Sequence, residues 1–586
     1  MNLLSKIALG SGATFWLLIS SVNAQPPITG RLTSALENTT ADTTVAVLVF
    51  FYDKGFSTKD ELRSALDRRG LQFSPRALKR RAKMGRQEMT FEDLPVNTDY
   101  IRRIVALGAK HRQSLTWFNA ASFEMTGPQV KICQNLSFVK SIDLLPARSK
   151  RIMPEFETTG LKMPEAESPK AHLLNYGPSF TQDSLINAVI CHDSGYSGAG
   201  VLVAMLDNGF RKGHQAFDSI RSSGRLVDEW DFCSSADTVD WDAHGTAIWS
   251  AAGGYVPGQL IGPAYKSLWA IYHTEDMSQE MPVEEDHWAA ALQRADSVGA
   301  EVVSSSLAYR DFDLPQYSYS YEDLDGNTAI SSLAARHAAS LGIIVCNAMA
   351  NSGPSLGSLA APADADSIIS VGATDSFGII ASYSSRGPTY DGRPKPEVCA
   401  QGTQVYLASW TTTTSYGRGS GTSCATPLVA GACALILEAH PDWTPMQVRE
   451  ALMMTASRSA SPDSNTYGWG IIDTWAAIHY SASGATGENP QPRVGPGLAL
   501  SCRPNPMRSE AVISFTMPRP GSAKLSVYDI TGRLVYQSPT INAAPGNNQF
   551  SWYGRDYSGR LLGNGVYFCR VNGGGQAGII KITIIR

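Results

Sequence analysis

Short apolar runs alternate with helix-like stretches between about residues 171 and 482. The runs are strand-sized and almost wholly apolar, at 201–206, 268–272, 302–307, 343–346 and 368–371. The stretches between them have apolar residues at helical spacing, as in 287–297, 330–340 and 426–439. Strands that alternate with helices form mainly parallel sheets with both faces covered. The pattern predicts an α/β domain over 171–482, with its site at the carboxyl ends of the strands.

The segment before this domain has a mixed pattern. A strand is predicted at 44–52, an amphipathic helix at 59–69 and a basic helix at 76–86, and two further units lie near 99–107 and 130–142. We expect a compact α+β module over 25–150, followed by a linker over 151–170. The basic run could serve nucleic-acid binding or processing, but a solvated helix face is the simpler interpretation.

Beyond a linker rich in Gly and Pro at 483–498, the chain carries only strand-sized segments. They lie at 511–517, 522–528, 534–537, 548–552, 565–571 and 577–585, separated by turn residues. Several short strands with frequent turn signals are typical of a β-sandwich. We therefore expect a small β-sandwich over 499–586.

The first 24 residues have the pattern of a secretory signal peptide. One charge, Lys6, precedes an apolar stretch over 7–22, and the segment ends in Val22-Asn23-Ala24, a small-residue cleavage pattern. A membrane anchor is the alternative, but Gly and Ser interrupt the stretch, which is short for a span of about 20 apolar residues. We predict a signal peptide over 1–24 and a secreted or cell-surface protein.

Charge is distributed unevenly along the 586 residues. The net charge of −4 argues against a general nucleic-acid binder, so no nucleic-acid partner is expected. Residues 25–150 carry 20 Lys/Arg and 12 Asp/Glu, residues 171–482 carry 14 and 33, and residues 483–586 carry 11 and 4. The first two segments are opposite in charge, which favours a docked pair.

Three motifs in the predicted α/β domain carry candidate chemistry. Asp207 follows the apolar strand 201–206, His244 precedes a run of small residues, and Ser423 stands at the entry to an apolar helix. At a helix entry, backbone N–H groups and the helix dipole can stabilise developing negative charge. Taken singly, however, Asp207 fits a turn or cap residue and Ser423 fits a helix N-cap.

Together, these motifs in the order Asp, His, Ser resemble the subtilisin-like serine proteases, peptidase family S8, over about residues 171–482. The resemblance implies a three-layer α/β fold with a mainly parallel sheet and hydrolysis of peptide bonds in protein or peptide substrates through an acyl-enzyme. It makes Ser423 the nucleophile, His244 the general base, and Asp207 the residue that orients the imidazole.

Two further segments extend the resemblance. The run EVVSSSLAY at 301–309 is similar to the strand that lines the family's substrate cleft, which implies substrate binding by residues Ser306, Leu307 and Ala308. The run AMANSG at 348–353 is similar to the family's oxyanion segment, which implies that the amide of Asn351 polarises the scissile carbonyl.

The sequence also departs from the family pattern. Asn208 stands where a small hydroxyl residue is usual, Gln401 replaces a proline, and Ala308 and Ala350 each replace a glycine. None of these changes removes a catalytic group, but the two alanines leave the details of the specificity pocket open. Cys424 is an alternative nucleophile, although its side chain is expected to face the core.

The flanking domains resemble partners of this enzyme class. Residues 25–150 look like an inhibitory, fold-assisting propeptide, which implies a precursor cut within 146–170. Residues 499–586 resemble an immunoglobulin-like type IX secretion sorting domain and the flagellar hook-capping repeat, at 503–506, 527–533, 556–559 and 565–568. This implies export from a Gram-negative bacterium by outer-membrane secretion machinery. A plain accessory β-sandwich is the alternative.

Cysteines and acidic clusters add weaker signals. Cys346, Cys399 and Cys433 lie in apolar runs and are predicted to be buried thiols, whereas disulfides 191–233 and 502–569 remain open. Six acidic residues between 275 and 286 suggest either a solvated loop or a preference for basic substrates. No cofactor is expected to be required, and no metal site is assigned: the family admits structural calcium, but Asp323-Leu324-Asp325-Gly326-Asn327 lacks the distal Glu of a calcium loop.

We interpret the chain as the precursor of a subtilisin-like serine endopeptidase. Two alternatives remain: a catalytically silent surface protein that uses the fold as a binding module, and a dedicated processing protease with few substrates.

Overall fold

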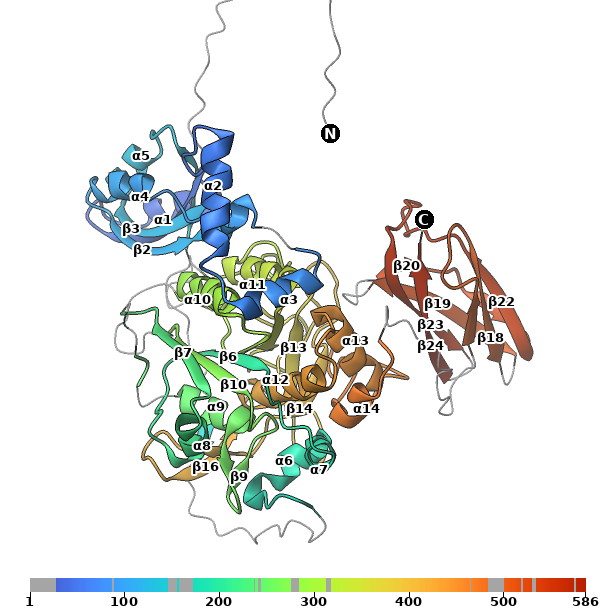
Figure 1. Ribbon diagram of the computed structural model, residues 1–586. Helices are drawn as coiled ribbons and strands as arrows, with labels where there is room; N and C mark the ends of the chain where they lie inside the picture. The colour runs from blue at the N-terminus through green and yellow to red at the C-terminus, as the bar shows by residue number, and fades with distance from the viewer. Residues whose placement is uncertain are drawn as a thin grey trace, which may run out of the picture.

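The structure is a computed structural model of the chain. It describes residues 28–86, 89–145, 155–157, 172–234, 236, 238–240, 244–275, 284–311, 318–463, 465–482, 500–517, 520–529, 534–573 and 576–585. The predicted signal peptide and almost all of the two predicted linkers lie outside the described residues. Figure 1 shows three folded units that follow one another along the chain.

The N-terminal unit is an α+β domain built on an antiparallel sheet of order β2-β3-β1-β4. The strands are β1 (Thr44–Phe51), β2 (Lys110–Leu115), β3 (Ala120–Thr126) and β4 (Val139–Leu144). Its helices are α1 (Gly30–Glu37), α2 (Lys59–Gly70), α3 (Pro75–Lys83), α4 (Thr98–Val105) and α5 (Gly127–Cys133). The strand and two helices predicted first along this segment are therefore present.

The central unit contains a seven-stranded parallel sheet of order β14-β13-β12-β11-β6-β10-β7. The strands are β6 (Leu202–Asp207), β7 (Leu226–Asp231), β10 (Leu268–His273), β11 (Val302–Ser305), β12 (Ile344–Ala348), β13 (Ile369–Thr374) and β14 (Val398–Gln401). The predicted fold class is confirmed, and the five predicted apolar runs form five of these strands.

Helices cover both faces of this sheet. The longer ones are α9 (His244–Gly253), α10 (Glu285–Val298), α11 (Ile330–Ser340), α12 (Thr422–Ala439) and α13 (Pro445–Thr455). Smaller elements are α6 (Phe180–Leu185), α7 (Ala188–Asp193), α8 (Asp218–Ser222), α14 (Thr474–Ile478), β5 (Glu155–Glu157), β8 (Tyr255–Val256), β9 (Leu260–Ile261), β15 (Val405–Ala408) and β16 (Tyr416–Ser420).

Alternate residues of β6 face opposite sides of the sheet and divide the core in two. Ala204 and Leu206 belong to the apolar cluster that includes α10 and α11. Val203 and Met205 belong to the cluster that includes α9 and α12. Because side chains alternate along a strand, Asp207 at the end of β6 is on the side of α9 and α12.

Helix α12 forms much of the second core. Among the described helices, it alone is long and apolar enough to span a membrane, but 89% of it is buried inside the protein. Burial on all sides explains why it is apolar around its whole circumference.

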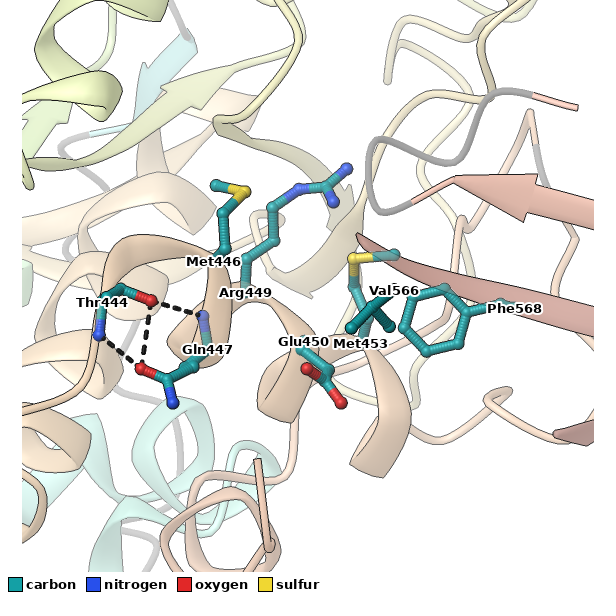
Figure 2. A pocket seen from close by; sticks show the side chains of 8 residues that line it. All are labelled: Thr444, Met446, Gln447, Arg449, Glu450, Met453, Val566 and Phe568. Atoms are coloured by element: carbon teal, nitrogen blue, oxygen red, sulfur yellow. Dashed lines mark hydrogen bonds between the residues drawn. The ribbon is translucent and has the colours of Figure 1, made fainter. Parts of the chain in front are cut away.

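The C-terminal unit is a β-sandwich, as predicted. One sheet contains β17 (Leu500–Arg503), β18 (Ala511–Met517) and β22 (Gly546–Trp552). The other contains β19 (Gly521–Asp529), β20 (Leu534–Gln537), β21 (Ile541–Ala543), β23 (Gly565–Gly573) and β24 (Gln576–Ile584). A single apolar cluster fills the domain. Strand β23 faces α13 across a pocket lined by Met453, Val566 and Phe568, among others (Figure 2).

The basic helix α3 lies against α10 of the central domain (Figure 1). Arg80 and Arg81 are each 1% exposed, and both pair with the equally buried carboxylate of Asp296. The simpler interpretation of the basic run as a solvated helix face is therefore wrong. Asp296 lies 216 residues after Arg80 in the chain, so the sequence around Arg80 could not indicate that this side chain is buried.

A second buried ion pair joins the two domains. Arg112 Nε donates to Asp286 Oδ2 at 3.0 Å, and Ser122 Oγ donates to the same oxygen at 2.5 Å. Burial is the largest single effect and acts to raise the pKa of Asp286, but the charges of Arg112 and His287, together with the hydrogen bonds from Arg112 and Ser122, outweigh it and hold the pKa below its ordinary value. The predicted docking of two oppositely charged segments is thus present in the structure.

No disulfide bond forms in the described part of the chain, which includes all nine cysteines. Cys346, Cys399 and Cys433 are buried thiols, as predicted. The two pairings left open, 191–233 and 502–569, are not made.

Candidate active site

Asp207 ends β6 in the middle of the sheet, at the edge where the parallel strands terminate. The residue is 1% exposed. Because this edge is where α/β sheets place their sites, Asp207 is positioned to orient a partner from α9 or α12.

His244 is the first residue of α9 and meets Asp207 directly. Its Nδ1 lies 2.9 Å from Oδ1 and 3.1 Å from Oδ2 of Asp207. A carboxylate can only accept, so Nδ1 carries the proton and Nε2 keeps the lone pair. The imidazole is thereby held in the tautomer that a general base requires.

Two neighbours bring α9 close to β6. A Cβ on Gly245 would lie 2.4 Å from the carbonyl oxygen of Gly209 and 2.9 Å from Cβ of Asp207, so only glycine fits there. Asn208 Oδ1 accepts the N–H of Gly245 at 3.2 Å and satisfies a donor at the helix start. Sequence reasoning noted Asn208 only as a departure and missed this contact.

Ser423 lies in the first turn of α12, which packs against α9. The residue is 4% exposed. Among the described residues, neither Ser423 Oγ nor His244 Nε2 has a hydrogen-bond partner of standard geometry. Buried polar atoms are nearly always satisfied, so these two atoms, at the starts of packed helices, are candidates to contact a group from outside the chain.

Asn351 is tied to the start of α12. Its Oδ1 accepts from the backbone N–H of Thr422 at 2.9 Å and from Thr422 Oγ1 at 3.0 Å. Because both contacts use the oxygen, the amide Nδ2 is left to donate elsewhere. Ala350, where the family has glycine, holds φ at +82°, a left-handed conformation that disfavours a side chain.

The segment predicted to bind substrate follows β11. Ser306 Oγ donates to the carbonyl of Ser423 at 3.0 Å, which places this segment beside the candidate nucleophile. Leu307 is 3% exposed and packs in the core, and its carbonyl accepts from Asn347 Nδ2 at 3.1 Å. Ala308 is half-buried. Leu307 therefore contributes its side chain to the core, whereas Ser306 lies beside the candidate nucleophile.

Cys424 is fully buried next to Ser423. Burial raises the pKa of its thiol to about 12, so the thiolate that nucleophilic attack requires does not form at neutral pH. This environment disfavours the alternative in which Cys424 is the nucleophile.

The acidic cluster at 275–286 is not a uniform solvated loop. Glu285 is 1% exposed and accepts from Tyr319 Oη at 2.6 Å and from Ser331 Oγ at 2.5 Å. A carboxylate held in this way cannot reach a substrate side chain, which removes Glu285 from the suggested preference for basic substrates. Asp276 and Glu280 lie outside the described residues.

The half calcium loop is occupied by other contacts. Asp325 Oδ1 accepts backbone N–H groups of Asn327 and Thr328 at 2.7 and 3.0 Å, as in a turn before a helix. The guanidinium of Arg336 donates to the carbonyl of Gly326 and to Asn327 Oδ1. A cation side chain therefore holds the oxygens that a calcium ion would need, and these residues do not fit a calcium site.

All three units match known families. Residues 198–470 match the subtilase family, residues 46–158 match a peptidase S8 propeptide domain of Bacteroidota, and residues 507–576 match the FlgD Ig-like domain.

Curated relatives agree with these matches. Serine protease AprX of Bacillus subtilis (strain 168) is 28% identical over 339 residues, which cover 50% of this chain and 69% of the relative. Subtilisin of Bacillus pumilus is 32% identical over 297 residues, covering 50% of this chain and 96% of the relative. Subtilisin E of Bacillus subtilis (strain 168) is 32% identical over 299 residues, covering 50% and 70%.

Proposed function

The chain belongs to the subtilase family as a subtilisin-like serine peptidase with a propeptide, and from this premise we propose that Asp207, His244 and Ser423 are its catalytic triad. One observation carries the proposal. The buried Asp207–His244 pair leaves Nε2 without a partner, and Ser423 Oγ, on the helix packed against α9, is also without one.

The proposed reaction follows from these atoms. Ser423 Oγ attacks the scissile carbonyl while His244 Nε2 removes its proton, and Asp207 stabilises the imidazolium that results. The imidazolium then protonates the leaving amine, which leaves an acyl-enzyme on Ser423. Water activated by the same imidazole releases the acid. Every group required belongs to the protein, so the proposed reaction needs no cofactor.

We propose that Asn351 Nδ2 and the backbone N–H of Ser423 form the oxyanion hole. The contacts of Asn351 Oδ1 with Thr422 support this proposal, because they fix the side chain at the start of α12 through its oxygen and leave its amide nitrogen to donate elsewhere. A donor that is oriented before the reaction stabilises the oxyanion without reorganisation. Residues 306–308 would bind the substrate backbone beside it.

The precursor is proposed to inhibit itself. Beyond the docked N-terminal domain, β5 pairs antiparallel with β16, with Glu155 opposite Ser420, three residues before Ser423. The chain that follows the N-terminal domain therefore passes close to the candidate nucleophile. This contact supports a cut within 146–170 by the enzyme itself.

Export is the remaining part of the proposal. The match of residues 46–158 to a Bacteroidota propeptide supports a Gram-negative source, and the many subtilisins among the relatives support secretion. We propose that residues 1–24 direct export and that the immunoglobulin-like C-terminal domain is recognised by type IX secretion machinery at the outer membrane.

The proposal is tested by expressing residues 25–586 as the parent sequence and as the Ser423→Ala variant. Intact mass and fluorophosphonate labelling are measured on both, with Cys424→Ala as the control. We expect the parent and Cys424→Ala to label and to shorten within 146–170, and Ser423→Ala to do neither.

Two other outcomes are informative. A parent that labels but keeps its full length would retain Ser423 as nucleophile and assign maturation to another protease. A folded parent that never labels, even after its propeptide is cut away, would contradict the triad and favour the binding-module alternative. Cleavage of a peptide library then separates a dedicated processing protease from a broad one.

A further inference from the structure

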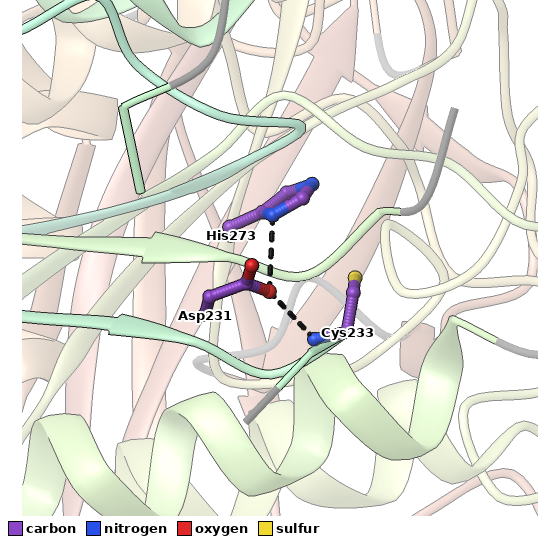
Figure 3. A group of neighbouring side chains, drawn as sticks. All are labelled: Asp231, Cys233 and His273. Carbon is purple, nitrogen blue, oxygen red and sulfur yellow. Dashed lines mark hydrogen bonds and ion pairs between the residues drawn. The ribbon is translucent and has the colours of Figure 1, made fainter. Parts of the chain in front are cut away.

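Three potential metal ligands meet at the ends of β7 and β10, beside the candidate active site. The parallel register of these strands places His273 opposite Asp231, and Cys233 follows two residues later. One donor atom from each residue lies within 4.8 Å of the other two (Figure 3). All three residues lie within the match to the subtilase family at 198–470, and the proposed triad does not include them.

His273 is oriented like a metal-binding imidazole. Its Nε2 donates to the backbone carbonyl of Glu275 at 2.7 Å, so Nε2 carries the proton. The other nitrogen, Nδ1, lies 3.0 Å from Asp231 Oδ1, the distance of an ion pair, so the imidazole and the carboxylate are already brought together. Metal-ligating histidines in proteins commonly fix their other ring N–H on a carbonyl in this way.

The carboxylate of Asp231 is also fixed in place. Its Oδ1 accepts the backbone N–H groups of Cys233 and Ser234 at 2.8 and 3.1 Å, and its Oδ2 accepts from Ser234 Oγ at 2.6 Å. The carboxylate is therefore held beside the backbone of Cys233 and the imidazole of His273, in a geometry that does not depend on a long flexible side chain.

Cys233 differs from the other eight cysteines, because it alone is not buried. Its Sγ lies 3.6 Å from Nδ1 of His287, and Arg112 Nη2 lies 3.2 Å from the opposite nitrogen of that ring. Because a guanidinium can only donate, it places the ring proton on Nδ1, where it points at the sulfur. The sulfur is thus an acceptor, as it is in a metal-bound thiolate.

We propose that Asp231, Cys233 and His273 bind one borderline-soft divalent cation of the Zn²⁺ type. One thiolate, one imidazole and one carboxylate are ligands that Zn²⁺ prefers and that Ca²⁺ and Mg²⁺, which require oxygen donors, do not. A water molecule would supply the fourth ligand.

The proposed ion would clamp the edge of the sheet next to Asp207. The residue after His273, Thr274, donates its N–H to the carbonyl of Asp207 at 2.9 Å, and Phe232 N–H donates to the carbonyl of His273 at 2.9 Å. A cation that joins the ends of β7 and β10 therefore stiffens the strand that borders the triad. Its role is structural, and loss of the ion should lower stability before it changes the reaction.

Binding is tested on the Ser423→Ala precursor, so that proteolysis does not interfere. Co²⁺ and Zn²⁺ are titrated after treatment with a chelator, with absorption, metal content per chain and melting temperature as readouts. We expect one ion per chain and a thiolate-to-cobalt charge-transfer band in the near ultraviolet. Zn²⁺ should raise the melting temperature and slow the reaction of Cys233 with a disulfide thiol reagent.

Variants make the assignment specific. Cys233→Ser should abolish the charge-transfer band. His273→Asn should weaken binding at least about tenfold, because loss of even an outer-shell partner of a metal ligand costs about 10–100-fold in metal affinity. His172→Asn is the matched control, because its Nδ1 also pairs with a carboxylate, Asp193 at 2.6 Å, but no thiol completes the group. The His172→Asn variant should bind Co²⁺ and Zn²⁺ with the affinity of the parent.

The proposal is overturned if the parent shows no charge-transfer band and Zn²⁺ leaves the thiol reaction rate unchanged. It is equally overturned if folded Cys233→Ser binds Co²⁺ with the parent's affinity and spectrum. Cys233→Ser is expected to fold, because the side chain of Cys233 is partly exposed. Its Co²⁺ binding can therefore be measured even if His273→Asn does not fold.

Discussion

The catalytic domain meets its two neighbours through very different surfaces. On the N-terminal side, Arg80 and Arg81 share the carboxylate of Asp296, and all three groups are buried almost completely. On the C-terminal side, Val566 and Phe568 of β23 face α13 across a cavity of about 300 Å³ (Figure 2). One contact is filled with matched charges, and the other leaves an apolar gap.

This difference separates two kinds of attachment. A buried charge network tolerates little displacement, because loss of one partner leaves an uncompensated charge that costs about 3–5 kcal/mol. A contact that leaves a pocket between its two sides forfeits part of its dispersion energy and separates at lower cost. The N-terminal domain is therefore held in one orientation, whereas the C-terminal domain is attached more loosely.

The largest effect is expected from breaking the charge network. Asp296→Ala leaves Arg80 buried without its carboxylate and leaves Arg81 with that of Asp93 alone, so the inhibition constant of the N-terminal domain for the mature enzyme should rise about 10²–10³-fold. Asp99→Ala is the control, because its pair with Arg102 is exposed and worth at most about 1 kcal/mol. Equal inhibition constants for the two variants would place the binding energy elsewhere.

Acid should weaken the same interface to a smaller extent. The docked state holds the pKa of Asp286 below its ordinary value of 3.8, so docking favours the charged carboxylate. The associated stabilisation is complete above about pH 4 and is lost as pH falls through the depressed pKa. Inhibition measured as a function of pH should weaken below about pH 4, and Asp286→Asn should flatten this dependence. Inhibition that becomes stronger as pH falls would contradict this prediction.

The smallest effect is expected on the C-terminal side. Ending the chain at residue 482 removes the β-sandwich and its hydrogen bond from Arg570 Nη1 to the carbonyl of Pro462, a long contact of 3.4 Å. We expect kcat/KM of the mature enzyme on a peptide substrate to stay within about twofold, because contacts between linked domains are usually small and mobile. A loss of tenfold or more in kcat/KM would show that the catalytic domain depends on its C-terminal neighbour, and it would contradict the loose attachment inferred here.

Sequence patterns predicted the parts of the fold that depend on local rules. The apolar run before Asp207 and the apolar helix after Ser423 become β6 and α12, because burial on both sides selects continuous apolar segments. Strand β7 was not predicted from the apolar pattern. It lies at the edge of the sheet, and its half-buried sequence, LVDEWD, contains three acidic residues.

Long-range contacts could not be predicted in the same way. The run around Arg80 looked solvated because the carboxylate that buries it belongs to α10. Similarly, the six acidic residues between 275 and 286 suggested one cluster. Glu285, however, is buried and accepts hydrogen bonds from Tyr319 and Ser331. In the candidate site, the motifs named the three triad residues, whereas the helix contact of Asn208 depends on the approach of α9 to β6.

The docking of the N-terminal domain also has a consequence for concentration. While the chain is continuous, that domain stays near its surface at an effective concentration that does not change with dilution. A cut within residues 146–170 turns the same contacts into a complex of two molecules, whose occupancy falls as the enzyme is diluted. Transfer of the cut precursor from a confined compartment to open medium would thus release the domain without any change in Arg80, Arg81 or Asp296.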